Sequence, residues 1–185
     1  MVEESAALLR PIPLRQPLLF YMGHLPAFAW NHLACGVLHR ERFAPELDEL
    51  FEAGIDPRDD ADPAVDSHRA ADVAGPARQR VLAYRERVRE ELGHVLAEPA
   101  LQPVLPMVLE HELMHHETLM YMLGQLPAWA RRPYPRGPAE GLTGSVQAGG
   151  RIRIPAGPAR LGAARDGRFR WDNEQPELIV PTDAF

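Results

Sequence analysis

Two histidines one helical turn apart are the strongest chemical signal in the sequence. His111 and His115 lie in the run His-Glu-Leu-Met-His-His-Glu-Thr at residues 111–118. On an α-helix, residues four apart project from the same face, so both imidazoles can reach one cation at roughly 2.0–2.2 Å. Two neutral imidazoles facing each other in an apolar interior would otherwise lack acceptors for their protons. The pair therefore predicts a metal site rather than two packed core histidines.

A third ligand must come from another part of the chain. The remaining histidines are His24, His32, His39, His68, His94 and His116. His116 points roughly 100° away from His115 on the same helix. The residue pattern favours His24, which stands on an apolar segment beside Gly23, because glycine allows close approach of a backbone or a metal. The pattern alone leaves the other histidines open.

The same run also fits the His-Glu-x-x-His helix of zinc proteases, in which Glu112 would be the general base. One class of these enzymes needs glycine and histidine at positions 118 and 121, where this chain has Thr118 and Tyr121. Another class needs a glutamate some 20–25 residues later, and Glu140 lies among prolines and glycines there. A zinc metalloprotease is therefore a less favoured alternative.

Two apolar helices must carry the three histidines. The first is expected from Pro17 to about Leu38, with Pro26 kinking or locally unwinding it. The second is expected from residue 101 or 103 to residue 123, closed by Gly124. Because this second helix is apolar nearly all round, we expect it to be buried.

Two further helices and a long loop are expected between them. Residues 46–53 predict a short amphipathic helix, and residues 77–97 predict a longer one. The apolar face of the longer helix is expected to consist of Val81, Tyr84, Val88, Leu92 and Val95. Residues 55–77, rich in Asp, Pro and Ala, predict a loop whose length favours a functional role.

The chain changes character after the last helix. Residues 131–150 are rich in proline and glycine and predict a linker. Short β-strands are expected at residues 151–154 and 177–180. The 35 residues from 151 to 185 cannot bury a core of their own. We therefore expect a helical domain over residues 1–130 and an incomplete second domain over residues 151–185.

Composition narrows the functions open to the chain. Its 185 residues carry a net charge of −6, which argues against a nucleic-acid partner. All 20 basic residues are arginine, so Schiff-base chemistry, pyridoxal phosphate attachment and a phosphate-loop lysine are excluded. The single cysteine, Cys35, cannot form an intramolecular disulfide. Neither a signal peptide nor a membrane span is evident, so a soluble cytoplasmic protein is expected.

Three motifs in the same order resemble one enzyme family. They are Pro-Leu-Arg-Gln-Pro-Leu-Leu-Phe-Tyr-Met-Gly-His at residues 13–24, the His-x-x-x-His-x-Glu pattern at 111–117, and Ile-Pro-Ala-Gly at 154–157 followed by Trp-Asp-Asn-Glu-Gln-Pro at 171–176. Over nearly the whole chain, they resemble the iron-dependent sulfoxide synthases of ergothioneine and ovothiol biosynthesis, of the hercynine oxygenase type. The resemblance implies a mainly α fold, with a DinB-like four-helix bundle, a linker and the start of an α+β domain similar to the formylglycine-generating enzyme.

The resemblance also implies a non-haem iron(II) centre held by His24, His111 and His115, in agreement with the pattern. Glu117 matches the glutamate of the motif. Helical geometry turns it some 200° from His115, so a supporting or packing role is expected rather than ligation. The implied reaction uses O2 to join the sulfur of cysteine or γ-glutamylcysteine to the imidazole of a histidine derivative such as hercynine, giving a sulfoxide. Three histidines leave coordination positions open for these small-molecule partners.

The chain departs from the family's pattern in three places. The family's second domain continues well beyond the equivalent of Phe185 and supplies a catalytic tyrosine. We therefore assign no catalytic residue here and expect this N-terminal fragment to bind metal without turnover. The first helix of the bundle is also shortened or missing. The loop at residues 55–77 lies where the family gathers substrate arginines, and Arg58, Arg69 and Arg78 are the ones available.

Two further hypotheses stay open. A DinB-like bundle can act as a metal-dependent thiol transferase, which would turn over a thiol without consuming oxygen. Alternatively, the bundle is not an enzyme and its histidines are only packed, in which case it would retain no tightly bound metal. Metal content and oxygen uptake distinguish these hypotheses from the oxygenase.

Overall fold

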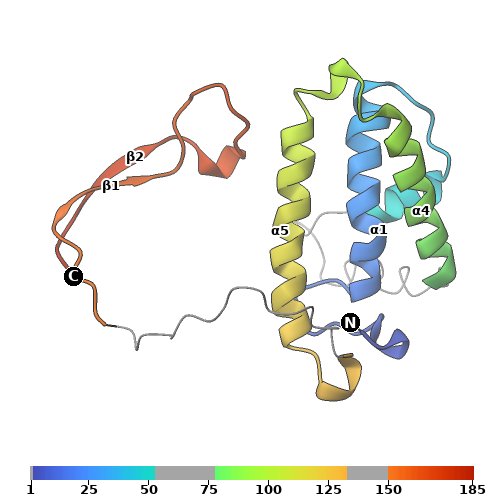
Figure 1. The fold of residues 1–185 in the computed structure, drawn as a ribbon, viewed down its shortest axis with the longest axis horizontal. Helices are drawn as coiled ribbons and strands as arrows, with labels where there is room; N and C mark the ends of the chain where they lie inside the picture. Colours follow the sequence, from blue (N-terminus) through green and yellow to red (C-terminus); the bar gives the residue numbers. More distant parts are fainter. Residues whose placement is uncertain (1, 53–77, 133–149) are drawn as a thin grey trace, which may run out of the picture. The chain divides into compact units, whose positions relative to one another are not determined.

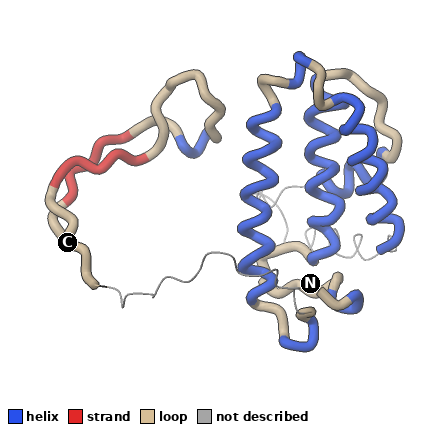
Figure 2. The backbone as a smooth tube through the Cα atoms, in the orientation of Figure 1, coloured by secondary structure: helices blue, strands red, loops and turns tan. Residues whose placement is uncertain are grey.

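A computed structural model describes residues 2–52, 78–132 and 150–185 (Figure 1). The chain divides into two compact units, Met1–Tyr134 and Pro135–Phe185. In the described residues, the first unit is helical and the second holds a two-stranded sheet (Figure 2). The mainly helical class is therefore confirmed, whereas the DinB-like bundle, the domain boundaries and the likeness of the second unit to the formylglycine-generating enzyme stay predictions.

The central element of the first unit is α1 (Leu18–Ala29), which packs against three other helices. These are α2 (Pro45–Glu52), α4 (Arg78–Val95) and α5 (Leu105–Gly124). Most of α1 is consequently buried, which explains why its sequence is apolar on nearly every face. None of the described helices combines the length and the apolar character that a membrane crossing requires.

The expected disturbance at Pro26 lies further along the chain than predicted. Helical hydrogen bonding continues past Pro26, and the regular α-helix ends at Ala29. A π-helical segment follows over Trp30–Val37 and ends near His39, which has a positive φ of 53°. One side of these two segments faces the core, since Phe20, His24, Ala27 and Asn31 are buried and Cys35 is half-buried.

The predicted amphipathic helices are confirmed as α2 and α4. All five residues expected on the apolar face of α4 are buried. Gly54 and the loop at residues 55–77, with Arg58 and Arg69, lie outside the described residues. Arg78 begins α4 and pairs with Glu4 at 3.0 Å.

One-turn helices lie at Glu4–Ala6, Pro99–Leu101, Ala128–Ala130 and Asp172–Glu174.

The expectation that the histidine-bearing helix α5 is buried all round is wrong. Its buried residues are His111, His115, Thr118 and Met122, which lie on one face. The opposite face is apolar but open, and Leu109 and Met120 are 58% and 70% exposed. The reason is that α5 packs mainly on α1 in the described structure, so only one of its faces is covered.

The second unit contains strands β1 (Gly157–Leu161) and β2 (Leu178–Thr182), which pair antiparallel with Gly157 opposite Thr182. The strand expected at residues 177–180 is thus confirmed, but the one expected at 151–154 is wrong. Ile154 exchanges two backbone hydrogen bonds with Phe185, and the regular strand starts only at Gly157. Residues 151–153 form no backbone hydrogen bond with any described residue, so no strand pairing extends over them. The linker predicted at residues 131–150 falls mostly outside the described residues.

A glycine on α1 brings α2 close to the histidine site. The ring of Phe51, which is fully buried, lies directly over Gly23. A Cβ atom at position 23 would meet three ring carbons of Phe51 at 2.4–2.5 Å. The glycine before His24 therefore makes room for an aromatic side chain of α2, where the sequence had suggested approach of a backbone or a metal.

We expect Gly23→Ala to destabilise the fold by about 1–3 kcal/mol, because the added methyl group overpacks the contact with Phe51. Gly93→Ala on α4 is the matched control, since a Cβ there meets nothing within 4 Å. That control should be neutral or stabilising by up to about 1 kcal/mol through helix propensity. Urea denaturation of both variants measures the difference, and equal stabilities would contradict the packing argument.

Candidate metal centre

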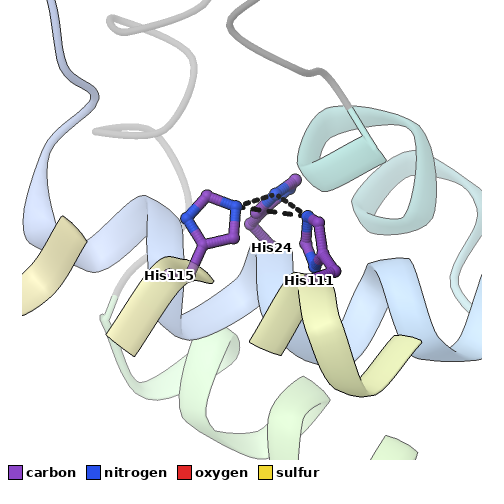
Figure 3. Close-up of side chains that lie close together, drawn as sticks. All are labelled: His24, His111 and His115. Atoms are coloured by element: carbon purple, nitrogen blue, oxygen red, sulfur yellow. Dashed lines mark hydrogen bonds between the residues drawn. The ribbon is translucent and has the colours of Figure 1, made fainter. Parts of the chain in front are cut away.

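Three histidine side chains from two helices converge on one point (Figure 3). His24 comes from the middle of α1, and His111 and His115 come from successive turns of α5. Their Nε2 atoms form a triangle in which all three edges measure 3.2 Å. All three residues are buried, with 4–7% of their surface exposed. The structure thus brings together the three residues that the sequence singled out.

The tautomer of His24 follows from its second ring nitrogen. Nδ1 of His24 lies 2.6 Å from the backbone carbonyl oxygen of Phe51. A carbonyl oxygen only accepts, so Nδ1 must carry the proton and donate it. In the neutral ring, Nε2 then holds a lone pair, and this lone pair points toward the other two imidazoles. A metal-bound histidine is commonly oriented by a carbonyl in this way.

The surroundings keep the three imidazoles neutral. Burial is the main cause that lowers the pKa of His24, although the bond to Phe51 opposes it. Burial and the neighbouring histidines lower the pKa of His111 to about 3. Burial, His24 and Arg15 lower the pKa of His115 to about 4. Each ring can therefore offer a lone pair at neutral pH, which is the form in which histidine binds metals.

Hydrogen bonds among the three rings cannot account for their arrangement. A ring nitrogen has one in-plane direction, so it either donates or accepts. Since each nitrogen has only one role, at least one edge of the triangle joins two donors or two acceptors and is not a hydrogen bond. The centre of a triangle with 3.2 Å edges lies about 1.8 Å from each nitrogen, slightly less than usual metal–imidazole distances of ~2.0–2.1 Å. The three nitrogens would therefore hold a single cation if each offers its lone pair.

Aromatic side chains enclose the three imidazoles. Phe28 stacks on His111 with ring centroids 3.6 Å apart and planes within 8°. Phe20 stacks on His24 at 5.1 Å, and Tyr21 leans against His115 at 5.3 Å. These rings hold the imidazoles in place and exclude water. Phe28 could have been found from the sequence, because it lies four residues after His24 on the same helix.

The other candidate histidines are not ligands in the described structure. His32 is exposed and packs on Phe28 with ring centroids 4.2 Å apart, at the edge of the site. His39 and His94 are exposed, and His116 pairs with Glu112. His68 lies outside the described residues. Glu117 is exposed and forms no hydrogen bond with the three histidines in the described part of the chain, so its supporting role stays a prediction.

The position of Glu112 disfavours a zinc protease. Its carboxylate lies 3.4 Å from Nε2 of His116, on the solvent side of α5. It lines a groove between α1, α4 and α5 together with Arg85 and Arg89. A general base would instead have to reach a water on the metal. The third nitrogen comes from an upstream helix, an order that the protease patterns considered above do not have.

We expect the metal-free protein to lose stability as the pH falls from about 6.5 toward 4. The folded state keeps His111 and His115 neutral, whereas the unfolded chain takes up protons near the ordinary pKa of 6.5. The free energy of unfolding should change by at most about 1.4 kcal/mol per pH unit for each histidine that is fully protonated in the unfolded chain and neutral in the folded one. Urea denaturation between pH 4 and 8 measures it.

His111→Ala should reduce this slope, while His116→Ala, at an exposed position on the same helix, should leave it unchanged. A slope that His111→Ala does not alter would show that the buried imidazoles do not cause the pH dependence.

Comparison with known proteins shows what this chain is similar to in sequence. The chain matches none of the known protein-family models. It is 29% identical to ergothioneine biosynthesis protein 1 of Neurospora crassa over 203 aligned residues, which cover the whole chain and 23% of that relative. The chain thus spans about a quarter of the relative's length. The resemblance predicted from the motifs is confirmed: the chain is homologous to part of an ergothioneine biosynthesis protein.

Proposed function

We propose that this chain is the iron-binding part of an oxygen-dependent sulfoxide synthase of the ergothioneine and ovothiol type. The observation that carries the proposal is the convergence of three Nε2 atoms, from His24, His111 and His115, within 3.2 Å of one another. Homology to an ergothioneine biosynthesis protein supplies the chemical context. Three neutral nitrogens suit zinc as well as iron, and this homology favours iron.

The proposed reaction joins two organic substrates. The S–H bond of a thiol and a C–H bond of an imidazole are lost, and a C–S bond forms. Dioxygen is the oxidant: one of its oxygen atoms ends in the sulfoxide and the other in water. Iron(II) at the three histidines would supply the activation of dioxygen. The proposed substrates are cysteine or γ-glutamylcysteine as the thiol and a histidine derivative such as hercynine.

The residues of this chain contribute orientation and shielding. The three imidazoles are neutral, and a metal with three protein ligands would keep other coordination positions for substrates. Phe20 and Phe28 stack on two of the rings and restrict water. The carbonyl of Phe51 fixes the tautomer of His24. These groups position the reactants, whereas the redox chemistry belongs to the metal.

The proposal is tested by anaerobic iron(II) binding to the whole chain. The wild-type protein should bind one iron(II) per chain, and His111→Ala should abolish stoichiometric binding because two imidazoles remain. His116→Ala is the matched control, since it removes an exposed histidine of the same helix and should bind iron normally. Absence of iron binding by the wild-type chain, or unchanged binding by His111→Ala, would overturn the proposal.

Nitric oxide distinguishes an oxygenase site from a closed structural site. Because three protein ligands leave positions open, the iron(II) protein should bind nitric oxide and show the EPR signal of a high-spin iron–nitrosyl adduct. An iron-loaded protein that shows no such adduct would indicate a fully coordinated metal, and the oxygenase assignment would then fail.

A further inference from the structure

One ligand of the proposed metal centre depends on the position of a short neighbouring helix. The partner of His24 is a backbone atom, the carbonyl oxygen of Phe51, which lies in the last turn of α2. A backbone group moves only when its helix moves. Because α2 has eight residues, it is too short to be stable alone. Its contacts with other elements therefore decide where this carbonyl lies.

Apart from the bond to His24, two buried hydrogen bonds tie α2 to separate parts of the fold, and both involve Asp48. At the surface, Glu46 and Glu52 of α2 also pair with Arg80 and Arg42. The hydroxyl of Tyr84 on α4 donates to Oδ1 of Asp48 at 2.6 Å. The side-chain amide of Asn31, on the π-helical segment, donates to the backbone carbonyl of Asp48 at 3.3 Å. Asp48 is fully buried and stands one turn before Phe51 on the same helix.

Burying these polar groups in the core costs free energy. Burial raises the pKa of Asp48, against the lowering by Tyr84, and burial together with Asp48 raises the pKa of Tyr84. The second carboxyl oxygen of Asp48 and the amide oxygen of Asn31 have no hydrogen-bond partner among the described residues. Apolar side chains of similar size often stabilise a core at least as well as such a group. The arrangement therefore calls for a role other than stability.

Hydrogen bonds define position in a way that apolar contact does not. The ring of Phe51 lies over Gly23, which sets how closely α2 approaches α1. Such a contact tolerates sliding of the helix, whereas a hydrogen bond restricts both distance and direction. The bonds of Asp48 restrict sliding and rotation of α2, and thereby the direction of the Phe51 carbonyl.

We propose that the buried Asp48–Tyr84 hydrogen bond, assisted by Asn31, holds the Phe51 carbonyl in line with His24 and so orients this ligand. Asp48 and Tyr84 are then positioning residues of the metal centre, although neither touches it. This inference rests on the proposed function, because it assumes that His24 binds the metal.

Tyr84→Phe tests the inference, with Co(II) as the metal. This substitution keeps the buried ring and removes only the hydroxyl. We expect Co(II) to bind about tenfold more weakly, as is usual when an outer partner of a metal ligand is lost. In the Co(II) protein, the imidazole N–H signals are shifted by the metal, and the slowest of them to exchange with water should belong to His24. In Tyr84→Phe this proton should exchange faster.

Val88→Ala is the matched control, because it removes buried apolar volume one turn along α4 without touching the Asp48 bond. It should lower the melting temperature of the metal-free protein, yet keep the Co(II) affinity and the proton exchange of the wild type. If both variants lost Co(II) affinity equally, Tyr84 would contribute only to the stability of the fold, and the proposal would be overturned.

Asp48→Asn separates the hydrogen bond from the charge. The amide oxygen can still accept from Tyr84, so Co(II) affinity should stay within about twofold of the wild type. An affinity as low as that of Tyr84→Phe would overturn the proposal. Should Tyr84→Phe fail to fold, Asn31→Ala removes only the longer bond and should weaken binding several-fold, and a wild-type affinity would count against the role of Asp48.

The result with the wild-type protein distinguishes the two proposals. If the wild-type chain binds no Co(II), the metal centre itself fails, and the positioning role fails with it. If it binds Co(II), and Tyr84→Phe binds equally tightly with unchanged proton exchange, only the positioning role is overturned.

Discussion

The helical unit is organised around three imidazole nitrogens that face one another at 3.2 Å in an apolar interior. Without a cation, at least one pair of these nitrogens must bring two lone pairs or two N–H groups together. Burial makes it costlier, since it prevents protonation from relieving the repulsion. A fold tolerates such a cluster when a ligand offsets the cost, and this constraint explains why polar side chains occupy the buried face of α5.

The central position of α1 follows from the same requirement. His24 must meet α5 on one side and the carbonyl of Phe51 on another, so α1 has to be covered by several helices at once. Gly23 permits the close approach of Phe51, and the apolar residues around it exclude water. His24, the carbonyl that orients it and the helix that carries this carbonyl thus form one connected unit. The buried polar contacts of this helix lie away from the three histidines, in the bonds made by Asp48.

The open face of α5 shows where reasoning from composition failed. Apolar residues surround this helix, and apolar character all round normally indicates burial on every side. In the described residues, however, α5 is covered mainly by α1, and Leu109 and Met120 face outward. An apolar side chain can be buried, but the elements packed around it decide whether it is. The strand expected at residues 151–154 was wrong for a similar reason, since residues 151–153 find no backbone partner among the described residues and the regular strand begins at Gly157.

The sequence by itself predicted the helices and the histidine pair of α5. Spacing of four residues placed His111 and His115 on one face, and three- and four-residue steps identified the buried side of α4, because helix geometry is local and leaves a periodic trace. The motifs identified the homology that comparison confirmed. The sequence favoured His24 without excluding the other histidines, and the tertiary structure decided that it completes the triangle, 87 residues before His111. Only the tertiary structure shows that Phe51 and Asp48 support it. Every residue carries a backbone carbonyl, so the residue type does not show which carbonyl supports a site. Long-range contacts follow no periodic spacing, so a single sequence does not show them either.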